Sequence, residues 1–323
     1  MVVAGLLLLA FAADRFVLAA ARLSRHYGMS PVLVGALIVG MGTSAPELLV
    51  SAIAATKNDV DLAIGNAVGS NVANVTMVLG GTAVLVPLSG NLRVLRREGA
   101  TMFLAVIGFA VMLWDLHLHR WEGLLLLGGM LVAMWLIVRW ARADRSRARP
   151  DGASDNEEID IAVSPRREIV LGLVALGLTL LGADLLVRGG TVLAESMGVG
   201  SAFIGMTLVA IGTSLPELAT SIAGIRQGEH DLVLGNVVGS NLFNALAVAG
   251  LGASLAPGPI DPGFRVGAAA MVLASALAGF LAITGRELVR WEGFVLLGGF
   301  AGYVYLSYDA SLITTAIALV TGG

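Results

Sequence analysis

Residues 42–47 read GTSAPE and residues 212–217 read GTSLPE, each inside a long apolar stretch. Both proline and glutamate are unfavourable in such a place. Proline interrupts the hydrogen-bond ladder of a helix, and an acid at the bilayer centre costs at least about 2.5–3.5 kcal/mol. Because the same hexapeptide occurs twice, it indicates a purpose that outweighs both costs.

The composition around the hexapeptides is that of a membrane protein. Of the 323 residues, 57% are hydrophobic and 13% charged, whereas soluble proteins are about 45–50% apolar. Segments such as LLLLGGMLVAMWLIV (124–138) are apolar on every side, unlike the amphipathic helices of a soluble α-helical domain. The sequence predicts an all-α, polytopic membrane protein. Its lack of cysteine excludes disulfides, thiol catalysis and thiolate metal sites.

Apolar runs and their breaks predict ten transmembrane helices. The first shows no basic region and no cleavage site, so we interpret it as a span and not as a signal peptide. The predicted spans are 1–21, 30–56, 62–87, 98–116, 121–140, 168–190, 200–225, 231–256, 265–284 and 291–308.

An internal repeat organises these spans. Four words recur at one offset of 170 residues: ADRFV and ADLLV, the two hexapeptides, GNAVGSN (65–71) and GNVVGSN (235–241), and WEG at 121 and 291. The repeat predicts two homologous halves of five spans, 1–140 and 168–323, joined by a hydrophilic linker, 141–167. Because five is odd, the second half must be inverted in the membrane relative to the first.

Basic residues predict the orientation. With the linker in the cytoplasm, 15 of the 20 lysines and arginines fall on the inner side. By the positive-inside rule, both termini are then outside a cytoplasmic (inner) membrane. The inner residues are Arg22, Arg25, Arg93, Arg96, Arg97, Arg139, Arg142, Arg145, Arg147, Arg149, Arg166, Arg167, Arg226, Arg286 and Arg290.

The hexapeptides supply oxygen atoms at mid-membrane depth. Glu47 and Glu217 bring carboxylates, and the prolines before them clash with the carbonyls of Gly42 and Gly212. Backbone carbonyls freed in this way are tolerated only where they line a cavity or coordinate a ligand. Hydroxyls follow each glycine in the sequence: Thr43, Ser44, Thr213 and Ser214.

The second repeated word adds hydroxyls and amides. Ser70 and Asn74 are four residues apart, hence on one helical face, and Ser240 and Asn244 repeat this spacing. Together the repeats predict an all-oxygen site with two carboxylates, which suits a hard cation such as Ca²⁺. Two glutamates neutralise one Ca²⁺, two Na⁺ or two H⁺. Such a site can therefore bind Ca²⁺ and the monovalent ions in turn and exchange one for the other.

A purely structural role for the two glutamates is the alternative. Their only candidate partners inside the membrane are Arg15 and Arg188, but each of these lies beside an acid of its own half, Asp14 or Asp184. We expect the two aspartates to be structural and the two glutamates to be functional.

The motifs resemble those of the Ca²⁺/cation antiporter superfamily, the sodium/calcium exchangers, and particularly its compact prokaryotic members. The resemblance covers essentially the whole chain and rests on the paired G-T-S-x-P-E and G-N-x-x-G-S-N words. It implies a central site formed by spans 2, 3, 7 and 8, with spans 1 and 6 sliding across it to give alternating access.

Carried over by position, the resemblance makes Glu47 and Glu217 the shared ligands of Ca²⁺ and Na⁺. It implies flanking ion positions lined by Thr43, Ser44, Thr213, Ser214, Ser70 and Ser240, an amide of Asn74 facing the centre, and backbone carbonyls at Gly40 and Ala210. One position departs from the pattern, since exchangers often carry aspartate where this chain has Asn244. The fixed charge is then −2, and H⁺ becomes a credible coupling ion.

The prediction is therefore an antiporter that extrudes Ca²⁺ in exchange for Na⁺ or H⁺, without a cofactor, acting as a monomer in the bilayer and binding no nucleic acid. Exchange of another divalent cation for H⁺, or of Na⁺ for H⁺, is the alternative. A passive cation channel would use the same oxygens, but inverted repeats with broken helices are typical of transporters. An enzyme is disfavoured because the chain has no cysteine and its histidines fall at span ends or in loops.

Overall fold

The computed structural model describes residues 1–90, 92–148, 164–196, 210–284 and 287–308. The described chain is almost entirely helical, as predicted, and four two-residue strands are its only extended elements. The first half consists of α1 (Val2–Tyr27), α2 (Pro31–Val34), the π-helix η1 (Gly35–Gly40), α3 (Met41–Thr43), α4 (Ala45–Thr56), α5 (Val60–Ala73), the π-helix η2 (Asn74–Val78), α6 (Leu79–Leu85), β1 (Leu88–Ser89), α7 (Leu92–Met112), β2 (His117–Leu118) and α8 (Arg120–Ala148).

Where it is described, the second half repeats this order at about the same spacing. It consists of α9 (Pro165–Ser196), α11 (Ala210–Thr213), α12 (Leu215–Arg226), α13 (His230–Phe243), the π-helix η4 (Asn244–Val248), α14 (Ala249–Leu255), β3 (Gly258–Pro259), α15 (Phe264–Thr284), β4 (Glu287–Leu288) and α16 (Arg290–Tyr308).

Membrane-spanning segments are clearest in six places within the described residues, and α2–α4 add a seventh as a pair of helical pieces bent by 44°. Helices α7 and α16 occupy two further predicted spans, 98–116 and 291–308. The remaining predicted span, 200–225, lies partly outside the described residues. The predicted linker, 141–167, begins within α8 and ends within α9.

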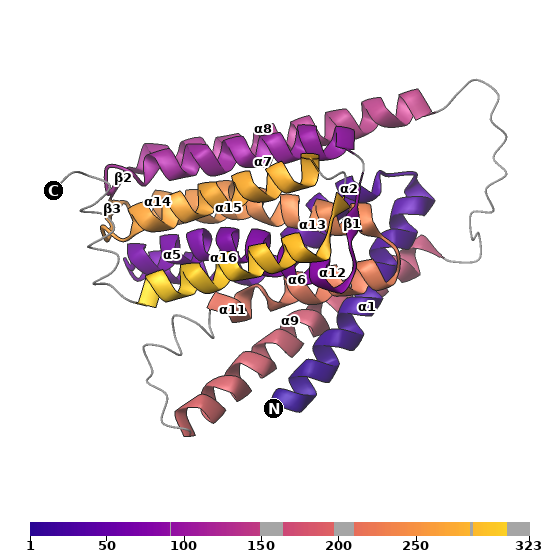
Figure 1. Cartoon of the computed structure of the whole chain (residues 1–323), viewed down its shortest axis with the longest axis horizontal. Helices are drawn as coiled ribbons and strands as arrows, with labels where there is room; N and C mark the ends of the chain where they lie inside the picture. The colour runs from indigo at the N-terminus through magenta and orange to yellow at the C-terminus, as the bar shows by residue number, and fades with distance from the viewer. Residues whose placement is uncertain (91, 149–163, 197–209, 285–286, 309–323) are drawn as a thin grey trace.

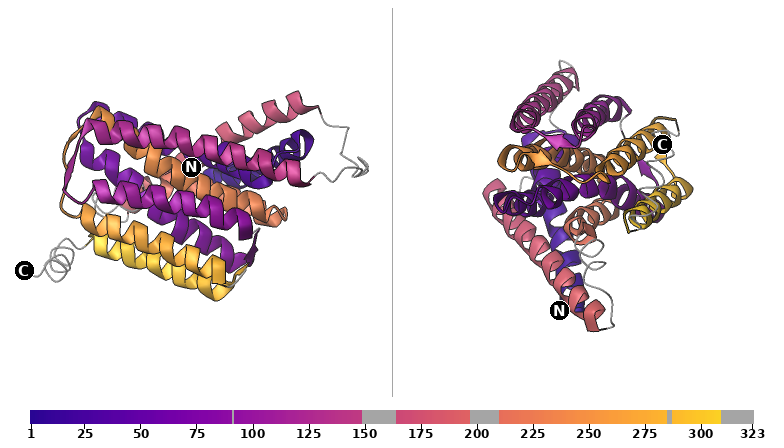
Figure 2. Two further views of the ribbon diagram at one scale, coloured as in Figure 1. Left: turned by 90° about the horizontal axis from the view of Figure 1, so that it is seen from above. Right: turned by 90° about the vertical axis from the view of Figure 1, so that its left-hand side faces the viewer.

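The two halves interlock. Helix α8 packs on α14, α16 on α6, and α15 on α7. Strand β1 pairs antiparallel with β4, and β2 with β3, so each strand has its partner in the other half. Most helices run roughly side by side in one bundle, while α1 and α9 pack on each other and extend obliquely away from it (Figures 1 and 2).

Glycines permit the close contact between α1 and α9. A Cβ on Gly182 would lie 2.6 Å from the backbone nitrogen of Leu9, and one on Gly5 would lie 2.7 Å from that of Leu186. Backbones that approach this closely gain van der Waals contact, which is the main attraction between helices within lipid. The two helices therefore form one tightly packed pair.

Candidate ion-binding site

Each hexapeptide breaks its helix at the serine. Ser44 has φ −83° and ψ 9°, and Ser214 has φ −90° and ψ 3°, so both lie outside the helical region. A new helix begins at the next residue, with Pro46 or Pro216 in its first turn, where proline is tolerated because the first N–H groups have no partner within the helix. The predicted break is confirmed, and the fold places it two residues before each proline.

The glutamates lie in the first turns of these new helices, Glu47 in α4 and Glu217 in α12. Their exposed fractions are 0% and 1%. The N-terminal end of a helix carries a partial positive charge that favours an acid. The break therefore changes how the protein holds each carboxylate, because the acid belongs to a helix start and not to a helix middle.

Three of the four carboxylate oxygens have no hydrogen-bond partner in the described structure: both of Glu47, and Oε2 of Glu217. The fourth, Oε1 of Glu217, accepts a 2.9 Å hydrogen bond from the Ser44 hydroxyl of the opposite half. An ionised carboxylate buried without donors is strongly unfavourable. These groups therefore require a proton or a cation.

Asn74 begins the π-helix η2 directly after α5, and Asn244 begins the π-helix η4 directly after α13. Both are fully buried, and neither amide has a hydrogen-bond partner at its oxygen or its nitrogen in the described structure. Segment η4 contacts α4, which carries Glu47, and η2 contacts α12, which carries Glu217. Each amide segment thus packs on the glutamate helix of the other half.

The π-helices were not predicted from the sequence. Such segments widen a helix by one residue and occur frequently at functional sites. A repeated Asn four residues after a repeated Ser was the only signal at these positions, and this spacing is equally compatible with an ordinary α-helix.

Two of the predicted hydroxyl groups already donate hydrogen bonds to backbone carbonyls. Ser240 donates a 3.2 Å hydrogen bond to the Gly40 carbonyl across the two halves, and Thr43 donates to the Val39 carbonyl at 3.0 Å. A Cβ on Gly40 would lie 2.9 Å from the Ser240 nitrogen, so glycine permits this approach of η1 to α13. The Gly40 carbonyl, predicted as a ligand position, is thus already a hydrogen-bond acceptor.

Four further predicted residues complete the set. The Ser214 hydroxyl is buried and has no hydrogen-bond partner in the described chain, and Ser70 is also buried. Thr213 is only half-buried, unlike its counterpart Thr43. Ala210 begins α11. The two halves of the site are therefore similar without being identical.

A pair of asparagines that sequence reasoning missed fixes the glutamate helices. The Asn66 amide donates to the Glu47 carbonyl at 2.8 Å and to the Ser51 hydroxyl at 2.9 Å. Asn236 donates to the Glu217 carbonyl at 3.4 Å and to the Ser221 hydroxyl at 3.1 Å. The 170-residue offset of both asparagines and both serines was the signal that could have identified them.

Among the described residues, no arginine pairs with Glu47 or Glu217. Arg188 forms an ion pair with Asp184 at 2.7 Å, as predicted, and Arg15 lies over the ring of Phe11. The expected local pairing of Asp14 with Arg15 was wrong, because Asp14 faces Arg226 of the other half at 3.6 Å. Helix α1 turns this aspartate towards α12, on which it packs.

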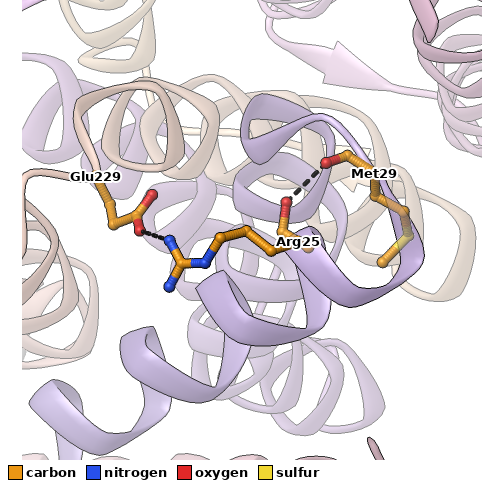
Figure 3. A network of polar contacts seen from close by, with 4 residues as sticks. Arg25, Met29 and Glu229 are labelled. Atoms are coloured by element: carbon orange, nitrogen blue, oxygen red, sulfur yellow. Dashed lines mark hydrogen bonds and ion pairs between the residues drawn. The ribbon is translucent and has the colours of Figure 1, made fainter. Parts of the chain in front are cut away.

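Two more ion pairs involve residues near the C-terminal end of α1. Arg25 pairs with Glu229 at 2.6 Å, where the chain passes from α12 to α13, and the adjacent Ser24 hydroxyl donates to the Met29 carbonyl at 2.7 Å (Figure 3). Arg22 pairs with Glu168 of α9 at 3.2 Å. These contacts connect α1 both to α9 and to the bundle.

No three His, Cys, Asp or Glu side chains gather at one point among the described residues. The ligands available at the breaks are instead two carboxylates, two amides and several hydroxyls; both glutamates, both asparagines and Ser214 carry buried polar atoms without a partner in the described structure. This set offers oxygen ligands to a hard cation, and Ca²⁺ accepts six to eight oxygens in flexible geometry.

Comparisons with known proteins find relatives that match most of the chain. The family model described as "Sodium/calcium exchanger protein" matches residues 1–139 and 168–308. The chain is 40% identical to "Putative antiporter CaxA" of Alkalimonas amylolytica (96% of this chain, 98% of the relative) and 37% identical to "Inner membrane protein YrbG" of Escherichia coli (97% of each). A solved structure of the sodium-calcium exchanger NCX_Mj superposes with a TM-score of 0.81 at 30% identity, covering 94% of this chain and 96% of that one.

Proposed function

Since this chain belongs to the sodium/calcium exchanger family, we propose that it extrudes Ca²⁺ across the cytoplasmic membrane in exchange for Na⁺ or H⁺, at a site centred on Glu47 and Glu217. The observation that carries the proposal is the set of buried oxygens without partners on both glutamates. They have no use as hydrogen-bond acceptors within the protein, and a bound cation would satisfy them.

The proposed ligands are the side chains at the two helix breaks and on the two facing helices. Ca²⁺ takes six to eight oxygens, and the coupling ions would use overlapping subsets. The set comprises Glu47, Glu217, Thr43, Ser44, Thr213, Ser214, Ser70, Asn74, Ser240 and Asn244.

Exchange follows from mutually exclusive occupancy. Either Ca²⁺ or the coupling ions neutralise the two carboxylates, and only the neutral site allows α1 and α9 to slide past it. The oblique position of this helix pair beside the bundle supports the assignment of α1 and α9 as the moving part (Figure 1). Sliding of α1 and α9 in one direction would then carry Ca²⁺ across the membrane, and sliding in the other direction would carry the coupling ions.

The topology proposed for this cycle has ten spans in two inverted halves, with both termini outside and the linker in the cytoplasm. It rests on the excess of arginine on one side and on the repeat of the described elements at a constant offset. A monomer contains the whole proposed site.

Coupling to H⁺ is the second candidate, and Asn244 favours it. Replacing an acid by an amide leaves two carboxylates, whose charge two protons balance as well as two Na⁺ do. Measuring ⁴⁵Ca²⁺ uptake into proteoliposomes under imposed Na⁺, K⁺ or H⁺ gradients distinguishes coupling to Na⁺ from coupling to H⁺. The gradient that drives uptake identifies the coupling ion, and uptake that needs no gradient would indicate a channel.

The role of the glutamates is tested in the same vesicles. We expect Glu47→Gln to abolish coupled Ca²⁺ uptake, and wild-type uptake by this variant would overturn the proposal. Glu122→Gln is the matched control, because Glu122 is also buried but accepts a 2.8 Å hydrogen bond from the His119 backbone nitrogen. A glutamine oxygen can accept the same bond, so transport should persist.

A further inference from the structure

An apolar cavity of about 320 Å³ lies between α7 and α15, apart from the proposed ion site. Its walls include Met102 and Phe103 of α7, Gly279 and Ile283 of α15, and Val237 of α13, and none of the proposed ion ligands lines it. Its volume is at the lower end of ligand sites, about 300–1,000 Å³. The cavity is therefore large enough for part of a small apolar molecule.

The internal repeat explains why the cavity exists. The position equivalent to Gly279, 170 residues earlier, is Phe109, a fully buried residue of the main core cluster. Gly90, which also lines the cavity, corresponds to Ile260, another buried residue of that cluster. At the positions that the repeat makes equivalent, one in each half, two large side chains are buried in the core, whereas glycines stand at both positions beside the cavity.

The cavity opens towards the outside of the bundle. Phe280 and Ile283 line it and are 62% and 40% exposed. A Cβ added to Gly279 would meet no atom within 4 Å. In a bundle that crosses the membrane, an exposed apolar surface faces lipid tails, so the cavity is accessible from the hydrocarbon layer.

A single arginine lies among the apolar walls. Arg96 lines the cavity near the N-terminal end of α7, is exposed, and has no carboxylate partner in the part of the chain that the structure describes. The neighbouring Arg97 is engaged, since it pairs with Glu98 at 3.2 Å and lies over the Trp140 ring. Arg96 is thus placed to bind an anion at the mouth of the cavity.

We propose that the cavity holds part of an acyl chain of an anionic glycerophospholipid, with the lipid phosphate bound by Arg96. An apolar wall with one guanidinium at its edge matches the two parts of such a lipid, because arginine pairs readily with phosphate oxygens and basic pockets between spans bind anionic head groups. This inference goes beyond ion exchange and does not depend on the coupling ion.

The experiment is native mass spectrometry of the purified full chain, titrated with phosphatidylglycerol or phosphatidylcholine. We expect one phosphatidylglycerol to bind in preference to phosphatidylcholine. Gly279→Leu fills the acyl site and should abolish this binding, whereas Arg96→Gln should weaken it about five-fold. Gly128→Leu is the control for the first variant, because Gly128 also faces open space but does not line the cavity.

Arg142→Gln is the control for Arg96→Gln, since Arg142 is exposed and lies outside the cavity wall. Equal losses in the two arginine variants would show general surface attraction and overturn the proposal. Retention of the lipid by Gly279→Leu, or equal binding of the two lipids, would do the same. A melting temperature close to wild type for each variant shows that a loss of lipid is not a loss of fold.

Discussion

The Ser44 hydroxyl donates a 2.9 Å hydrogen bond to Oε1 of Glu217. Ser44 belongs to the first copy of the repeated hexapeptide and Glu217 to the second, so the two copies meet across the interface between the halves. The other carboxylate oxygen of Glu217, Oε2, has no hydrogen-bond partner in the described structure.

Removing this donor should weaken cation binding. Ser44→Ala takes away a hydrogen bond to a charged group, worth about 1.5–3 kcal/mol, and a proposed ligand with it. We expect the apparent Ca²⁺ affinity in ⁴⁵Ca²⁺ uptake to fall at least about ten-fold. Thr82→Ala is a suitable control, because the Thr82 hydroxyl is buried but bonds only to the Val78 carbonyl of its own helix. An unchanged affinity in Ser44→Ala would contradict the proposed site.

Acid should inhibit Ca²⁺ uptake. The Glu47 carboxylate has no hydrogen-bond partner in the described structure, so a proton competes directly with Ca²⁺ for it. The neutral acid cannot balance a divalent charge. We therefore expect the apparent Ca²⁺ affinity to fall as the pH is lowered and to level off at alkaline pH, measured at constant Na⁺ concentration. An affinity independent of pH would show that the carboxylates do not exchange protons during transport.

The sequence predicted the two helix breaks and the polar residues beside them, because the information for both is local and repeated. Proline and glutamate in an apolar run indicate a helix break with a polar purpose whatever surrounds them. The offset of 170 residues then relates Glu47 to Glu217 and Asn74 to Asn244 without any structure. The helix breaks and the burial of both glutamates follow that expectation.

Other features depend on contacts between distant residues and were not predictable. Asp14 was expected beside Arg15, but the packing of α1 on α12 brings Arg226 to it. The π-helix at Asn74 has no composition signal that separates it from an α-helix. The cavity beside Gly279 emerges only when this glycine is compared with Phe109 in the folded chain.

Asn244 should determine the charge carried per Ca²⁺. Asn244→Asp adds one negative charge on η4, the segment that packs on the helix of Glu47. A third carboxylate requires one more coupling cation, so the reversal potential of Ca²⁺ flux should shift under a clamped K⁺ diffusion potential. Asn241→Asp is the control, since Asn241 is buried on the same helix but donates to the Val237 carbonyl. A reversal potential equal to wild type in Asn244→Asp would place this residue outside the ion site.

The contact between α1 and α9 should be sensitive to one methyl group. Gly182→Ala places a Cβ 2.6 Å from the Leu9 nitrogen, and overpacking of this kind costs about 1–3 kcal/mol. We expect a lower melting temperature and slower exchange. Gly177→Ala is a control on the same helix, because its Cβ would meet nothing within 4 Å. Equal melting temperatures for Gly182→Ala and Gly177→Ala would show that α1 and α9 do not pack as closely as the structure indicates.

The ion pair of Arg25 with Glu229 should affect the transport cycle more than stability. Its arginine is largely exposed and its glutamate is partly buried, and ion pairs near the surface contribute about 0–1 kcal/mol. It nevertheless connects α1 to the bundle, so it must break if α1 slides. We expect Arg25→Glu and Glu229→Arg each to change the exchange rate, and the double variant to recover it, with melting temperatures nearly constant. Additive effects in the double variant would show that the pair does not couple the two elements.

The exchange of partners between the halves has a consequence for how the chain is assembled. Strands β1 and β2 pair only with β4 and β3, and α1, α6, α7 and α8 pack on α9, α16, α15 and α14. Neither half therefore has a complete apolar interior of its own within the described residues. Translated as two polypeptides divided within residues 149–163, the halves should associate as an obligate heterodimer. Encoding both halves in one chain therefore ensures that they are made in equal numbers.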